Sequence, residues 1–155
     1  SATVSLYDDL EQLLLSRYIR LKTSPLTRIV QRGVLCAGFN WFSAPTVQRV
    51  QDYVIELLMQ TVFIHAQTAT VCHHYLAAVL SRLLENILQS YLSCLPYIEV
   101  FDANGILQML TDVTFVESVL HDFTTAHSRT LLAAFKLEMR HNARLAALEA
   151  EVNAV

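Results

Sequence analysis

The chain has 155 residues, of which 54% are hydrophobic and only 16% are charged, and its formal net charge is −3. The length suits one domain, residues 1–155, and the slight acidity gives no reason to expect a nucleic-acid partner. Because so low a charged fraction is unusual for a lone soluble domain, we expect an apolar surface covered by a partner, or one end of a longer helical rod.

The first helix is predicted over about residues 5–21, where leucines recur at helical spacing on one face. The next stretch, residues 23–44, contains Pro25, Gly33 and Gly38. Proline and glycine interrupt helical periodicity, so we expect this stretch to be irregular.

A second helix is predicted to begin at Ser43 and Pro45, because serine is a favoured N-cap and proline suits the first turn. Helical spacing then continues to Leu95, which is too long for one ordinary helix, and weak helix formers predict a break near residues 67–72. Residues 57–81 contain no Asp, Glu, Lys or Arg. Their many amides, imidazoles and hydroxyls make a membrane span a poor interpretation, so we assign them to the interior of a bundle.

The C-terminal third predicts two more helices. Pro96 should end the preceding helix, and the stretch from Asp102 to Gly105 is interpreted as a turn, in which glycine tolerates a positive φ. Apolar spacing predicts a fourth helix over about residues 106–123 and a fifth from Leu132 into the alanine-rich end. Without any strand signature, the fold class is all-α, a bundle of about five mostly antiparallel helices.

Histidine and cysteine are the residues that most invite a chemical interpretation. His73 and His74 are adjacent, so on a helix they point about 100° apart and cannot bind one ion from the same face. Cys72 precedes His73, but no third orienting residue is indicated. We therefore expect no metal, no cofactor and no enzymatic activity. The three cysteines, with no C-x-x-C pair, are interpreted as reduced, buried residues of a cytosolic protein, and no secretory leader is apparent.

Two groups of side chains are candidates for partner contacts. Five basic residues fall within 16 positions: Arg17, Arg20, Lys22, Arg28 and Arg32. They are interpreted as a solvated face, or alternatively as a contact for acidic lipid or an acidic partner. The second group is Phe39, Trp41 and Phe42. These aromatic residues could form an exposed anchor for a partner. Alternatively, Trp41 folds back into the bundle and pins the long connection that contains it, which is the interpretation we favour.

Five segments carry a resemblance to a known family: residues 24–41 with the sequence Gly-Phe-Asn-Trp at its end, residues 45–50, residues 62–67 ending in His-Ala-Gln, residues 79–85, and residues 101–108 with Asn-Gly-Ile-Leu-Gln. Together they resemble the C-terminal region of the exocyst complex component 2 family over roughly residues 24–120. This family belongs to the complex that tethers secretory vesicles to the plasma membrane.

The resemblance implies a rod of stacked helical bundles with this chain at its distal end, acting as a non-enzymatic structural module. It implies other exocyst subunits as partners, and a cytoplasmic protein that is peripheral at plasma-membrane sites of exocytosis. Ral GTPase is not expected to bind residues 1–155, because the family's Ral-binding immunoglobulin-like domain lies at the opposite end. A helical-rod subunit of a tethering complex in Golgi or endosomal traffic remains the alternative, as does a module that binds acidic phospholipids.

Overall fold

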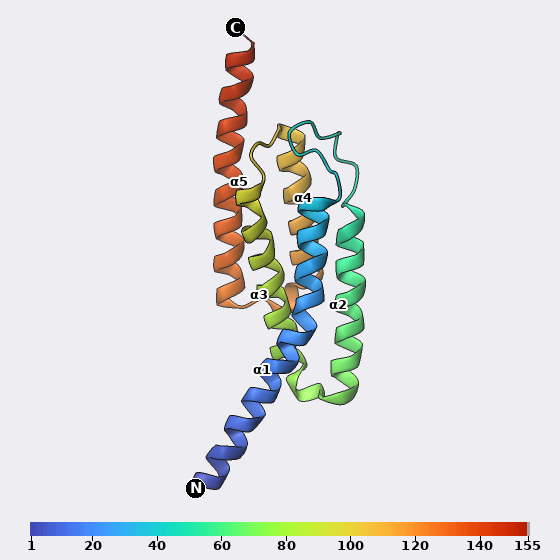
Figure 1. Ribbon diagram of the computed structural model, residues 1–155, viewed down its shortest axis with the longest axis vertical. Coiled ribbons are helices and arrows are strands. Elements are labelled where there is room, and N and C mark those ends of the chain that lie inside the picture. Colours follow the sequence, from blue (N-terminus) through green and yellow to red (C-terminus); the bar gives the residue numbers. More distant parts are fainter. Residues whose placement is uncertain (155) are drawn as a thin grey trace.

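The computed structural model describes residues 1–154, which form a bundle of five long α-helices (Figure 1). The helices are α1 (Ala2–Gln31), α2 (Asp52–Val71), α3 (Leu76–Cys94), α4 (Ala103–Val119) and α5 (Ala126–Asn153). Each successive helix runs opposite to the one before it, so α1, α3 and α5 point one way and α2 and α4 the other. The predicted all-α class is confirmed.

Helix α3 forms the centre of the bundle, because it contacts each of the other four helices. Its apolar residues recur three or four positions apart and are at most 2% exposed: Leu80, Leu83, Leu84, Ile87, Leu88 and Tyr91. Full burial of one such aliphatic side chain contributes roughly 1.5–3 kcal/mol. The buried stripe of α3 therefore supplies much of the core.

Helix α1 is longer than predicted, since it runs through Pro25 to Gln31 and continues as a π-helical turn, Arg32–Cys36. The expectation that residues 23–44 are irregular is wrong for its first half. Leu26, at 1% exposed, and other residues beyond the proline are buried against the bundle. Their packing outweighs the hydrogen bond that proline cannot donate.

The connection between α1 and α2 comprises residues 37–51, and no regular helix occurs in it. The predicted helix start at Ser43 and Pro45 is therefore wrong, because α2 begins only at Asp52, with Gln51 in an extended conformation as its N-cap. The reason is that the main chain of this connection bonds to side chains of α4, as described below.

The remaining boundaries lie close to the predicted ones. α2 ends at Val71, within the predicted break, and a short 3-10 turn, His73–Tyr75, leads into α3. α3 ends just before Pro96, as expected. The predicted turn at residues 102–105 is instead the first turn of α4, where the Asp102 carboxylate accepts a hydrogen bond from the Gly105 N–H at 2.6 Å.

Gly105 is helical and does not have a positive φ, which among the described glycines occurs only at Gly38, with φ 75°. Glycine is needed at position 105 for a different reason: a Cβ there would collide with the carbonyl oxygen of Trp41. The sequence correctly indicated that position 105 requires glycine. The requirement arises because the α1–α2 connection packs closely against α4, and not because of a positive φ.

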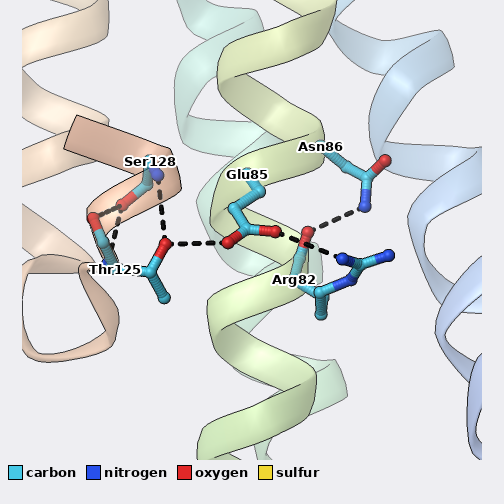
Figure 2. A network of polar contacts seen from close by, with 5 residues as sticks. All are labelled: Arg82, Glu85, Asn86, Thr125 and Ser128. Atoms are coloured by element: carbon cyan, nitrogen blue, oxygen red, sulfur yellow. Dashed lines mark hydrogen bonds and ion pairs between the residues drawn. The ribbon is translucent and has the colours of Figure 1, made fainter. Parts of the chain in front are cut away.

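Helix α5 begins with a capping box and is tied to α3 through Glu85 (Figure 2). The hydroxyl of the N-cap, Thr125, accepts from the Ser128 N–H at 3.0 Å and donates to the Glu85 carboxylate at 2.7 Å. Arg82 lies 3.6 Å from the other carboxylate oxygen. A carboxylate beside a helix N-terminus is favourable, because it faces the positive end of the helix dipole.

Helix α2 is the one described helix whose length and composition would suit a membrane span, with a mean hydropathy of 1.2. A single helix of this kind is weak evidence, because core helices of globular proteins pass the same test. α2 packs against α1, α3 and α4, with Leu57 and Ile64 in the core. However, Met59 and Val62 are 68% and 63% exposed, so the assignment of residues 57–81 to the interior is correct for one face of α2 only.

Candidate interaction surfaces

Four polar side chains of α4 and its N-cap hold the α1–α2 connection in place. The Asp102 carboxylate accepts from the Ala44 N–H at 3.1 Å, and the Asn104 amide donates to the Ala44 carbonyl at 3.2 Å. One helical turn further on, the side-chain amide of Gln108 donates to the Arg49 carbonyl at 2.9 Å. We call this set the α4 clamp: Asp102, Asn104, Gln108 and Asp112. Three of its members recur every four residues, which aligns them along one helix face.

Asp112 is the most buried member of the α4 clamp, at 0% exposed. Its carboxylate accepts four hydrogen bonds: from the main-chain N–H of Gln51 at 3.0 Å, the side chain of Gln51 at 2.8 Å, Gln108 at 2.9 Å and the Tyr53 hydroxyl at 3.2 Å. Burial raises the pKa of Asp112, although the bonds from Gln51, Gln108 and Tyr53 partly oppose that rise. With four donors around it, the carboxylate is best suited to a structural role.

The α4 clamp was not predicted from the sequence. The available signal was the pair Gln108 and Asp112, which are four residues apart within an otherwise apolar helical stripe. Polar residues at core positions need hydrogen-bond partners, so the pair marks a place where another segment approaches α4. The sequence does not show that this segment is the connection, about 60 residues earlier.

The three aromatic candidates have different environments. Trp41 is 6% exposed, its indole N–H donates to the Val34 carbonyl at 2.9 Å, and its ring centroid lies 5.7 Å from that of Phe101. Phe39 is half-buried against Trp41. Phe42 is 63% exposed and borders a hollow of about 470 Å³ between the start of α4 and the alanine-rich end of α5. Of the three, Phe42 alone is presented to solvent.

The N-terminal half of α1 leans away from the bundle (Figure 1). It carries an exposed apolar stripe. We call this stripe the α1 end surface, and its residues are 49–68% exposed: Leu6, Tyr7, Leu10, Leu13 and Leu14. The sequence pattern predicted an apolar stripe on this helix, and no other described helix covers its N-terminal half. Tyr7, Leu10 and Leu14 line a hollow of about 460 Å³ whose other wall includes Tyr75 and Val79 at the start of α3.

The five basic candidates have different surroundings. Arg32 pairs with Glu56 of α2 at 3.2 Å. The Lys22 ammonium donates to the Gln67 side chain at 2.9 Å and lies 5.4 Å from the centre of the Tyr18 ring. The others are exposed and have no ion pair within residues 1–154: Arg17, Arg20 and Arg28.

Histidines and cysteines are dispersed. Within the described part of the chain, no three residues of the types His, Cys, Asp and Glu are placed to hold a metal ion. All three cysteines are free thiols, but only Cys94 is buried; Cys72 is half-buried and Cys36 is exposed, contrary to the expectation that all would be buried. Burial, and secondly the nearby Cys36, raise the pKa of Cys94 to about 11.

Comparisons with known proteins identify relatives of the chain. The chain is 25% identical over 122 residues to mouse exocyst complex component 2, which covers 79% of this chain and 13% of that protein. It is 28% identical over 131 residues to the exocyst complex component SEC5A of Arabidopsis thaliana, covering 81% of the chain and 12% of that protein. The chain thus spans about an eighth of the length of these relatives. No solved structure matches it.

The family model for exocyst complex component Sec5 matches residues 2–144. That match includes the N-terminal half of α1 and most of α5, which lie outside the stretch of residues 24–120 that carried the resemblance in the sequence. It also decides between the exocyst and other tethering complexes, which the sequence had left open. The chain belongs to the Sec5 family of exocyst complex components.

Proposed function

We propose that this chain is a non-enzymatic structural module of an exocyst subunit, which helps to tether secretory vesicles by packing its helical faces against other helical units. Family membership supports a role in a vesicle-tethering exocyst subunit. The partners proposed are other exocyst subunits, and the place of action is the cytoplasmic side of the plasma membrane at sites of exocytosis.

The observation that carries this proposal is the α1 end surface. A continuous stripe of residues such as Leu10 and Leu14, about half exposed or more, is costly in water, because each buried CH₂ contributes about 0.8 kcal/mol when it is covered. Large exposed apolar patches mark interaction sites in stable proteins. The stripe lies on a long helix that projects from one end of the bundle, a geometry suited to end-to-end packing in a rod.

The test uses the tagged 155-residue chain in a lysate of cells that express the exocyst. Recovery of exocyst subunits by the wild type and their loss in a double variant, Leu10→Glu with Leu14→Glu, would support the proposal. Leu107→Glu on α4, where the wild-type leucine is 52% exposed, is the matched control and should recover the same subunits. If the double variant recovers the subunits as well as the wild type while its circular dichroism is unchanged, the α1 end surface is not the contact.

A further inference from the structure

The outward face of α2 carries a second apolar stripe, separate from the α1 end surface. Ile55, Met59, Val62 and Ala66 follow one another at intervals of four, three and four residues, and all are exposed. We call these four residues the outer seam of α2. Alternating intervals of three and four residues are the spacing of the residues through which helices pack along one another in coiled coils. The adjacent Phe63 is also 58% exposed.

Positive charge flanks this seam on the neighbouring helix α1. The bonds from Arg32 to Glu56 and from Lys22 to Gln67 fix the antiparallel register of the two helices. In this register Arg28, one turn before Arg32 on the same face of α1, lies level with the middle of the seam, near Gln60.

The charge of this part of the chain is strongly one-sided. Between Gln12 and Leu84 the chain has seven basic residues and only two acidic ones, Asp52 and Glu56. Both carboxylates are already engaged, Asp52 with Arg49 at 3.0 Å and Glu56 with Arg32 at 3.2 Å. An approaching partner therefore meets exposed guanidinium groups and no free carboxylate in this part of the chain.

A hollow lies where the seam meets α1. It has a volume of about 450 Å³ and is lined by Tyr18 and Lys22 from α1 and by Ala66, Gln67, Thr70 and Val71 from α2. Val71 is 78% exposed. The hollow therefore offers apolar surface for a large side chain, with an ammonium group at its edge to meet a carboxylate.

From these features we propose that the outer seam of α2, together with Arg28 and Lys22 of α1, binds an acidic amphipathic helix of another protein. The straight seam fits the apolar stripe of a helix, and the α1 cations fit carboxylates flanking that stripe. This inference deepens the proposed function, because it names the chemistry of one partner surface, distinct from the α1 end surface.

A protein helix fits these features better than an anionic membrane. Methionine, phenylalanine and arginine are enriched in the buried parts of protein interfaces, and the seam and its flank combine Met59, Phe63 and Arg28. Amphipathic helices that lie on a membrane also use phenylalanine and arginine, so Met59 is the residue that favours a protein partner. An anionic membrane is usually recognised by clusters of about 4–8 Lys or Arg, whereas the flank of the seam supplies Arg28 and Lys22, and Lys22 already donates to Gln67.

The experiment measures binding of fluorescently labelled synthetic helices to the 155-residue chain by anisotropy. The probes are peptides of about three heptads with leucine or isoleucine at the apolar positions and glutamate beside them, and a matched set with lysine in place of glutamate. Binding of the acidic set alone, weakened by added salt, is the expected result. Met59→Glu should weaken it at least about tenfold and Arg28→Glu several-fold.

Leu137→Glu on α5 is the control, because the wild-type leucine is 65% exposed and lies on another helix. It should leave binding unchanged. Equal binding of both peptide sets, or no binding of the acidic set, would overturn the inference. The inference would also be overturned if the chain bound no peptide but floated with vesicles of phosphatidylserine and phosphatidylcholine, and Arg28→Glu abolished that flotation. It would likewise be overturned if the chain self-associated and Met59→Glu abolished the self-association. Because the variants lie outside the α1 end surface, their failure leaves the subunit-recovery test intact.

Discussion

Replacing Asp112 by asparagine tests whether the α4 clamp stabilises the fold. Asparagine has the same shape, but one carboxylate oxygen becomes an NH₂ group, which cannot accept. The less costly orientation turns the NH₂ towards the Gln51 side chain and Tyr53, because the Tyr53 hydroxyl can rotate and accept from it. The Gln51 side-chain donor is then left without an acceptor, at about 1–3 kcal/mol when buried. Removing a buried charge offsets part of this, so we expect a net loss of roughly 1–2 kcal/mol in the free energy of unfolding.

The pH dependence of the free energy of unfolding provides a second, independent test. Burial raises the pKa of Asp112 in the folded state above its unfolded value of about 3.9, so the folded protein takes up a proton more readily than the unfolded one. The stability from this residue is fully present below the unfolded pKa and is lost as the pH rises through the folded pKa. The asparagine side chain of the variant cannot titrate. The destabilisation by Asp112→Asn should therefore be larger at acid pH than at neutral pH.

Equilibrium unfolding in urea, followed by circular dichroism at several pH values, measures both effects. Asp8→Asn is the control, because Asp8 is exposed on the N-terminal half of α1. The reasoning would be refuted by a change of less than about 0.5 kcal/mol for Asp112→Asn, the size of an ordinary surface substitution. A destabilisation that grows as the pH rises would refute the assigned direction of the pKa shift.

Two further predictions concern the connection and the thiols. Gly105→Ala places a Cβ against the Trp41 carbonyl, so we expect a loss of roughly 1–3 kcal/mol and a lower melting temperature, whereas an unchanged melting temperature would mean that the connection can move away. In the native protein Cys36 should react with a disulfide reagent at neutral pH much faster than Cys94, which is buried and has a pKa raised to about 11; equal rates would contradict that burial.

The number and type of the helices could be predicted from apolar spacing, because each helix buries one stripe. The errors occur where a distant segment decides the local structure. Val47 and Val50 lie at helical spacing, yet their stretch is not helical, since residues 44–51 bond to α4. Pro25 lies inside a helix because its neighbours are buried. Neither the partner segment nor the burial can be read from residues near these positions in the sequence.

The exposure of the candidate interaction surfaces could not be predicted from the sequence either. The apolar stripe of α1 was recognised, but a pattern cannot show whether the bundle or another molecule covers it. Trp41 and Phe42 are adjacent and both aromatic, yet one is buried and the other is exposed, because the backbone turns Trp41 towards Phe101. Asp112 was visible as a residue, but the significance of its carboxylate depends on Gln51 and Tyr53, which approach it only in the fold.

The odd number of alternating helices has a mechanical consequence. The start of α1 and the end of α5 lie at opposite poles of the molecule, and α5 and the C-terminal half of α1 run roughly along its long axis (Figure 1). Both helices pack against the central α3. A pulling force applied at those poles would slide α1 and α5 lengthwise along α3 in shear. Many side-chain contacts would then have to yield together, whereas helices peeled away sideways would lose them one after another. The bundle is therefore built to resist tension along its axis.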